Sequence, residues 1–265
     1  MSWGKSLSRQ GASIALVGVC VLSGCGWLRS DSKPVKIHPQ AIAAWHGQPR
    51  AVAATLLLRT VDAAGESLQI TLHLWRAADG RTRLLVTKID VDVLQALVQA
   101  DGSFAAFAPR SGLRTTGDFA DPQLPAGLAD LRLLISEVCD GPLSPALAAV
   151  AQATPEFANV LTGPAAEGVT ATVTLDQQSE QVREKVLRDD RGRLLYHLRY
   201  LTYTTYDECH RPSKVDGKVG DGGTLTAYLR RFDSLGDISA ERMRLTIPDT
   251  ARAVPVTDFL EHLEP

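Results

Sequence analysis

Residues 67–75 alternate strictly between polar and apolar side chains, and this pattern argues against a helix in the segment. The sequence reads Ser-Leu-Gln-Ile-Thr-Leu-His-Leu-Trp. A two-residue period places alternate side chains on opposite faces of a β-strand. The aliphatic face consists of Leu68, Ile70, Leu72 and Leu74. We therefore predict a strand with one face buried.

Turn signals after this strand extend it into an antiparallel meander. Asp79-Gly80 and Asp101-Gly102 are dipeptides typical of tight hairpin turns. The strands predicted before the middle of the chain are 55–61, 67–75, 81–89, 103–108 and 113–119. After the middle they are 169–175, 181–188, 193–206, 224–232 and 241–247, with a glycine-rich loop over 217–223.

The middle of the chain has a helical period instead. Its apolar residues recur at spacings of three, three, one and three, which draws a stripe along one helix face. The stripe consists of Leu128, Leu131, Leu134, Ile135 and Val138. Ser144-Pro145 suits the start of a second helix that continues through Ala153. A short C-terminal helix is predicted with Thr257 as its N-cap.

Strands followed by helices and then by strands predict an α+β fold, with helices against one side of an antiparallel sheet. Long, locally paired strands can curl into an incomplete barrel, whose interior is either a packed core or a ligand cavity. The strand 193–206 contributes an inner face that includes Tyr196, Leu198 and Tyr200. A packed core and a ligand cavity would both place these side chains on the inner face of the sheet. The sequence therefore leaves both interpretations open.

The N-terminus has the features of an export signal. Lys5 and Arg9 precede an uncharged apolar run, 11–22, whose length fits the roughly 7–15 residues of a secretory signal core. Leu22-Ser23-Gly24-Cys25 then resembles a bacterial lipobox. That resemblance implies cleavage before Cys25 and acylation of its thiol. Gly26 is not the Asp that retains lipoproteins at the inner membrane, so the resemblance favours the outer membrane, facing the periplasm.

These features divide the chain into three parts: a signal peptide over 1–24, a lipidated tether over 25–50 and a folded domain over 51–265. The whole chain has 28 Lys and Arg against 30 Asp and Glu. Loss of Lys5 and Arg9 leaves 26 basic residues, and the net charge falls from −2 to −4. Without a basic excess, nucleic acid is not an expected partner. The expected partner is the membrane, through the acyl anchor.

Cys139 and Cys209 remain once Cys20 is removed and Cys25 is lipidated. In an oxidising compartment an even pair of cysteines predicts a disulfide. The alternative is a metal site that uses Cys209 and His210, but adjacent ligands chelate poorly and no further metal-ligand spacing accompanies them. We predict the disulfide and no metal.

Motifs for catalysis are missing from the sequence. It contains no Gly-x-Ser-x-Gly nucleophile elbow and no phosphate-binding loop. Asp189-Asp190 is interpreted as a hairpin turn, and Asp90-x-Asp92 supplies too few oxygen ligands for calcium. We therefore expect no catalytic residues and no cofactor, and a non-enzymatic role.

Three stretches resemble the LolA/LolB lipoprotein-carrier superfamily, in a divergent form. The first is 98–103, with the Asp101-Gly102 turn, followed by 107–110 and Gly117. The second is 187–190, which runs into 193–200, and the third is the tyrosine-rich strand that reaches 211–214. The resemblance implies an unclosed β-barrel with a helical lid over an apolar cavity for acyl chains.

The hypothesis from sequence is therefore an outer-membrane lipoprotein that binds lipid or the acyl chains of lipoproteins. The cavity candidates are Leu68, Ile70, Leu72, Leu74, Tyr196, Leu198 and Tyr200. The lid candidates are Leu128, Leu131, Leu134 and Ile135. The alternative is a structural or accessory lipoprotein of an envelope assembly, with a filled core. A Cys139–Cys209 disulfide would staple the lid to the sheet and limit its opening.

Overall fold

The computed structural model describes residues 51–263, except 122–123, 125, 144, 154–158, 167, 177–180, 207–208 and 221. The predicted signal peptide, the lipidation site Cys25 and the tether lie outside the described residues. The described residues belong to one compact unit. No helix within the described ranges is both long and apolar enough to cross a bilayer.

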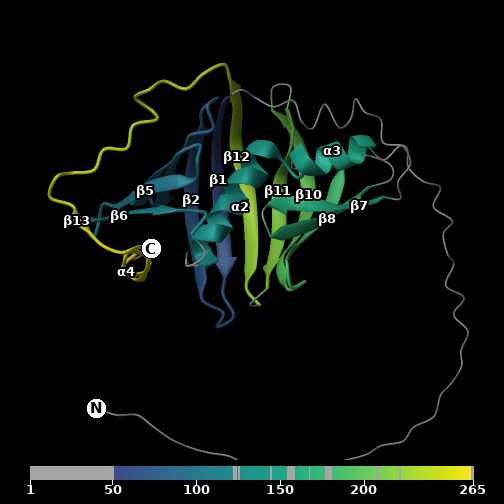
Figure 1. Cartoon of the computed structure of the whole chain (residues 1–265), viewed down its shortest axis with the longest axis horizontal. Coiled ribbons are helices and arrows are strands. Elements are labelled where there is room, and N and C mark those ends of the chain that lie inside the picture. Colours follow the sequence, from purple (N-terminus) through teal and green to yellow (C-terminus); the bar gives the residue numbers. More distant parts are fainter. Residues whose placement is uncertain are drawn as a thin grey trace, which may run out of the picture. The chain divides into compact units, whose positions relative to one another are not determined.

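One antiparallel sheet contains nearly all the regular structure (Figure 1). Among the described residues it has thirteen strands, in the order β13-β6-β5-β4-β3-β2-β1-β12-β11-β10-β9-β8-β7. The first group is β1 (Ala51–Val61), β2 (Ser67–Arg76), β3 (Thr82–Lys88), β4 (Val91–Val98), β5 (Ser103–Ala108) and β6 (Leu113–Asp118). The second is β7 (Val160–Ala166), β8 (Val169–Leu175), β9 (Val182–Asp189), β10 (Leu194–Tyr206), β11 (Cys209–Val219) and β12 (Thr224–Leu235).

Pairing of β1 with β12 joins the two groups into a single sheet. Ala51 lies opposite Leu235, and Val61 lies opposite Thr224. β1 also pairs with β2 over its length, so the first strand of the domain lies near the middle of the sheet. The sheet curls without closing, and the predicted α+β fold of an unclosed barrel with helices is confirmed.

Helix α2 (Ala126–Asp140) lies across the central strands in Figure 1, and α3 (Pro145–Ala153) follows it near β7. The last turns of α2 pack Leu131, Leu134 and Val138 against aliphatic residues of the inner sheet face. A second cluster, centred on Leu147, Val173 and Leu187, joins α3 to β7–β10. Burial of these faces is the main favourable term that holds helices to the sheet, at about 25 cal/mol per Å².

The C-terminal segment crosses from β12 to the far edge of the sheet. β13 (Arg252–Ala253) pairs in parallel with β6, and α4 (Val256–Glu261) follows it. α4 buries Phe259, whose side chain joins the same apolar cluster as the inner face of β1–β6. The predicted C-terminal helix is observed, but its N-cap is Pro255 and not Thr257, so it begins two residues earlier than predicted.

The sequence pattern did not predict β4, β7, β11 or β13, and one predicted strand is wrong. β4 follows a turn at Ile89 and Asp90, both with positive φ (51° and 61°), and lacks the usual glycine signal. β7 lies in a segment with no strand pattern of its own. Residues 241–247 form no strand. β12 already has β1 and β11 as neighbours, so the chain after it crosses the sheet end instead of pairing beside it.

The predicted glycine-rich loop over 217–223 is shorter than expected, because β11 continues to Val219. Gly217 pairs with Leu198 on one side and with Leu225 on the other. A Cβ at Gly217 would lie 3.0 Å from Leu198 Cδ2. Glycine therefore lets a strand pass close to its neighbours here, and the glycine marks a tight approach rather than a loop.

Gly117 on β6 provides a test of this packing. A Cβ there would lie 2.5 Å from Cζ of the buried Phe104 ring and 3.2 Å from Val256 Cγ2. We expect Gly117→Ala to lower the free energy of unfolding by about 1–3 kcal/mol, because overpacking forces a rigid ring to move. Gly236→Ala is the matched control, since a Cβ at that position would have nothing within 4 Å. Equal urea midpoints for the two variants would contradict the packing described.

Candidate functional site

An apolar cavity of about 350 Å³ lies between the central strands and α2. This volume falls in the ~300–1,000 Å³ range of small-molecule pockets. β1, β2, β9, β10, β11, β12 and α2 contribute its walls. The aliphatic lining comprises Leu56, Leu58, Ile70, Leu131, Leu133, Leu134, Val138, Leu187, Leu198, Val215, Val219, Leu225, Ala227 and Leu229. The remaining lining residues are Thr60, Glu137, Tyr196, Tyr200, Arg211 and Pro212.

The residues predicted from alternation lie at different places on the inner face. Ile70, Tyr196, Leu198 and Tyr200 line the cavity. Leu72 and Leu74 are 1% and 0% exposed and belong to the packed cluster of β1–β6. Leu68 is half-buried, opposite Thr60, and is not among the residues that line the cavity.

The predicted lid residues lie on α2. Leu131 and Leu134 line the cavity, and Ile135 packs against the main cluster. The side chain of Leu128 lies outside what the structure describes. The helix therefore provides part of the cavity wall.

Sequence reasoning missed the contribution of β1 and β12. Leu56 and Leu58 on β1 lie opposite Leu229 and Ala227 on β12, and all four line the cavity. β12 alternates in this region, whereas β1 has three consecutive leucines at 56–58, which do not show which face is inward. The pairing itself was not readable from sequence, because more than 160 residues separate the two strands.

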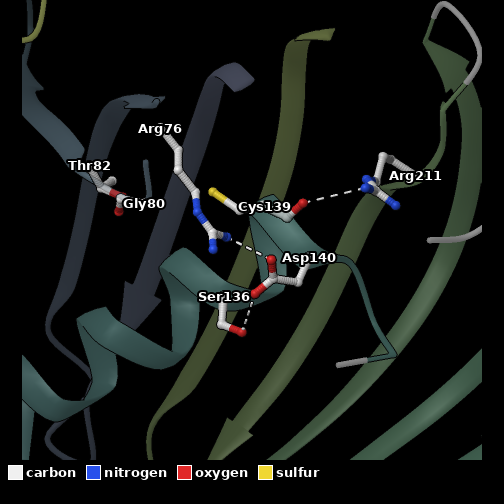
Figure 2. A network of polar contacts seen from close by, with 7 residues as sticks. All are labelled: Arg76, Gly80, Thr82, Ser136, Cys139, Asp140 and Arg211. Atoms are coloured by element: carbon white, nitrogen blue, oxygen red, sulfur yellow. Dashed lines mark hydrogen bonds and ion pairs between the residues drawn. The ribbon is translucent and has the colours of Figure 1, made fainter. Parts of the chain in front are cut away.

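Polar groups from both halves of the sheet hold the last turn of α2 (Figure 2). Arg76, at the end of β2, forms an ion pair with Asp140 at 2.6 Å (Nη1 to Oδ1). Ser136 Oγ donates to the other carboxylate oxygen of Asp140 at 2.9 Å. From β11, Arg211 Nη2 donates to the carbonyl oxygen of Cys139 at 3.4 Å. We call these contacts the α2 clasp. Cations at a helix C-terminus also interact favourably with its dipole.

Arg211 is a cation within the apolar core. It is 2% exposed, and its guanidinium carbon lies 5.2 Å from the ring centroid of Phe232. Burial lowers the pKa of Arg211, although a guanidinium stays charged in proteins. Gly141 makes room for it: a Cβ there would lie 2.9 Å from Arg211 Nη1, and its φ of +82° ends the helix in the left-handed region.

Glu137 forms a second polar cluster on the same turn of α2, at the cavity wall. Its carboxylate forms an ion pair with Lys185 of β9 and accepts a hydrogen bond of 2.7 Å from the Tyr200 hydroxyl of β10. Burial and the nearby Glu137 carboxylate raise the pKa of Tyr200 well above its usual value, so this phenol stays a proton donor. The cavity is therefore amphipathic, with its charged groups near the C-terminal end of α2.

The Glu137–Lys185 pair can be tested by stability. Only 4% of the Lys185 side chain is exposed, so Glu137→Ala leaves a buried ammonium without its carboxylate. We expect a loss of about 3–5 kcal/mol in the free energy of unfolding, measured in urea. The double variant Glu137→Leu with Lys185→Met replaces both charges by apolar side chains, and it should recover most of the lost free energy of unfolding.

The matched control is Asp233→Ala, which removes an exposed pair with Arg231 at 2.6 Å. Because 72% of the Arg231 side chain is exposed, the expected loss there is below about 1 kcal/mol. A loss of similar size in the two single variants would show that the Glu137 pair is not the buried contact described.

The predicted disulfide is not formed in this structure. Cys139 and Cys209 are both present as buried thiols and belong to the same apolar cluster. Burial raises the pKa of Cys139 to about 12, which leaves almost no thiolate at neutral pH. The pairing stays a prediction for the exported protein, and as thiols both groups act as small apolar core residues.

Labelling with a maleimide separates the two oxidation states. If the pair oxidises on export, denatured but unreduced protein should take no label at Cys139 or Cys209, and reduced, denatured protein should take label at both. In the reduced, folded protein we expect Cys139 to react much more slowly than after denaturation, because it is buried and protonated. Peptide mass spectrometry reads each site. Full labelling without reductant would contradict the disulfide.

Three solved structures are similar to this chain. One is a putative outer membrane lipoprotein-sorting protein domain from Vibrio parahaemolyticus, with 14% identity, a TM-score of 0.51 and coverage of 77% of this chain and 94% of that one. The chain has a divergent LolA-like fold. The second is a DUF1329 family protein from Desulfovibrio piger, with 10% identity and a TM-score of 0.51. The match covers 80% of this chain and 98% of that one.

The third structure is a LolA superfamily protein from Nitrosomonas europaea, with 10% identity and a TM-score of 0.49. The match covers 79% of this chain and 98% of that one. Neither a protein-family model nor a curated protein matches the sequence. The predicted resemblance is thus confirmed for the LolA-like fold. Among the described residues, no group of three His, Cys, Asp or Glu side chains is arranged to hold a metal ion.

Proposed function

We propose that this protein is a non-enzymatic envelope lipoprotein that binds lipid, or the acyl chains of lipoproteins, in the cavity beneath α2. The observation that carries the proposal is the lining of that cavity. Fourteen of its twenty lining residues are aliphatic, and they come from α2 and from strands in both halves of the sheet. Such a wall favours a ligand without hydrogen-bonding groups along most of its length.

Transfer of an acyl chain into this space removes apolar surface from water on both sides. Each buried methylene contributes about 0.8 kcal/mol. The charged end of the cavity, with Glu137, Tyr200 and Arg211, suits the polar end of such a ligand or the water that accompanies it. An amphipathic ligand therefore has one orientation in which its chain contacts leucines and its head group lies near the end of α2.

The α2 clasp gives this helix a fixed end. Arg76 and Arg211 hold its last turn, and Leu131 and Leu134 contact the cavity through apolar surfaces that make no directional bonds. In our proposal, ligand entry displaces the apolar part of α2 and the clasp acts as the pivot. The lid of the sequence hypothesis is then a helix anchored at one end.

The proposed location is the periplasmic face of the outer membrane, with acylated Cys25 as the anchor and 25–50 as the tether. A single acyl chain gives only marginal, reversible attachment, so stable anchoring needs more than one chain. In the proposal, the anchor keeps the cavity near the bilayer, where acyl chains can pass to or from the membrane. The similarity of the fold to a lipoprotein-sorting domain supports this assignment.

A charge placed in the cavity tests the proposed function. We expect Leu134→Glu to weaken binding of a fluorescent fatty acid by about tenfold or more, because an ionised carboxylate in an apolar site is costly. The measurement is equilibrium fluorescence with the soluble domain, in which Cys25 is replaced. Arg132→Glu is the matched control, since it introduces the same side chain at an exposed position of the same helix.

Native mass spectrometry gives an independent result. We expect lipid to copurify with the wild-type domain. The amount of bound lipid should fall in Leu134→Glu and stay unchanged in Arg132→Glu. A ligand-free mass together with no uptake of the fluorescent fatty acid would overturn lipid binding. The accessory role in an envelope assembly would then be the better hypothesis.

A further inference from the structure

The inner face of the sheet is hollow over one part and filled over another. Beneath α2 it borders the cavity of about 350 Å³. Over β4–β6 it is covered by α4, and only a residual space of about 20 Å³ remains. Both parts belong to one continuous apolar cluster, because Ile70, Leu131 and Leu225 pack with Phe259 in the same group.

The filling side chains come from α4 and the turn after it. Phe259 is 2% exposed, and with Leu260 and Leu263 it borders the small space against the sheet. The opposing wall consists of Leu94, Ala96, Val98, Phe104, Ala106, Thr115 and Phe119. This wall is as apolar as that of the large cavity, so α4 covers a surface that would otherwise suit a hydrocarbon chain.

Leu131 of α2 is the boundary between the two spaces. It lines the large cavity and also the small one. No other residue lines both cavities in the described part of the chain. The two spaces are therefore neighbours along the inner face, and Leu131 borders both of them.

The segment before α4 is fixed by backbone hydrogen bonds, and α4 itself packs on the sheet through apolar contacts. Arg252 N donates to Gly112 O at 2.9 Å, and Val254 N donates to Arg114 O at 3.0 Å. These bonds attach the chain to the edge of β6 just before the helix begins. α4 then extends over the inner face, where Phe259 and Leu263 make non-directional contacts that a hydrocarbon could replace.

We propose that α4 is an internal occupant of the binding face and that it sets the length of acyl chain the protein accepts. This proposal rests on the proposed function. Phe259 and Leu263 take the place that the distal part of a longer chain would occupy, and Leu131 ends the open cavity. The wild-type protein then selects shorter chains, and it accommodates longer ones only where α4 is displaced.

The test compares acyl-chain length profiles. Octanoate, dodecanoate, hexadecanoate and octadecanoate would compete with a fluorescent fatty acid on the soluble domain, below their micelle concentrations. The variants are Phe259→Ala with Leu263→Ala, which opens the filled part, and Leu131→Ala, which removes the boundary. Glu261→Ala is the control, because this residue lies on α4 and is exposed.

The quantity compared is the affinity for octadecanoate divided by the affinity for dodecanoate. We expect this ratio to rise at least about fivefold over wild type in both opened variants, and to stay at the wild-type value in Glu261→Ala. Leu131→Ala keeps the proposal testable if the α4 variant fails to fold by circular dichroism. If the wild-type domain binds the acids and every folded variant shows the same preference for chain length, the proposed role of α4 is overturned. Failure of the wild-type domain to bind any acid would overturn the proposed function, and this proposal with it.

Discussion

A curled sheet with an apolar inner face must cover that face, and this requirement organises the whole domain. The strands around β1 and β12 present leucines inward, and three helices pack on this face of the sheet. α2 spans the centre and α4 covers β4–β6, while α3 packs at the other end near β7. The cavity is the part of the face where α2 lies over the sheet without filling the space beneath it.

The polar groups of the interior gather where α2 ends. Asp140, Glu137 and the Cys139 carbonyl meet Arg76, Lys185 and Arg211, which come from strands on both sides of β1 and β12. Buried charges add little net stability when paired and are costly when separated, so such a cluster specifies position more than it adds energy. One turn of helix is thereby fixed, and the leucines before it are free of directional bonds to the sheet.

Alternation in the sequence predicted most strands and their inward faces, but not which inward residues face empty space. Ile70 and Leu72 lie two positions apart on one face of β2, yet one lines the cavity and the other is fully buried. The difference depends on what packs from the opposite side, which no local pattern encodes. The clasp and the Glu137–Lys185 pair were missed for a similar reason. Arg76, Lys185 and Arg211 look like ordinary strand residues until the strand order brings them together around α2.

The pairing of β1 with β12 also has a consequence for the order of assembly. β12 emerges near the end of the chain but occupies the middle of the sheet. Until residues 224–235 are available, β1 and β11 both present open edges, which can pair with other chains. Long-range pairing of this kind also slows folding. A chain that reaches its compartment unfolded therefore needs protection of these edges until almost all of it has arrived.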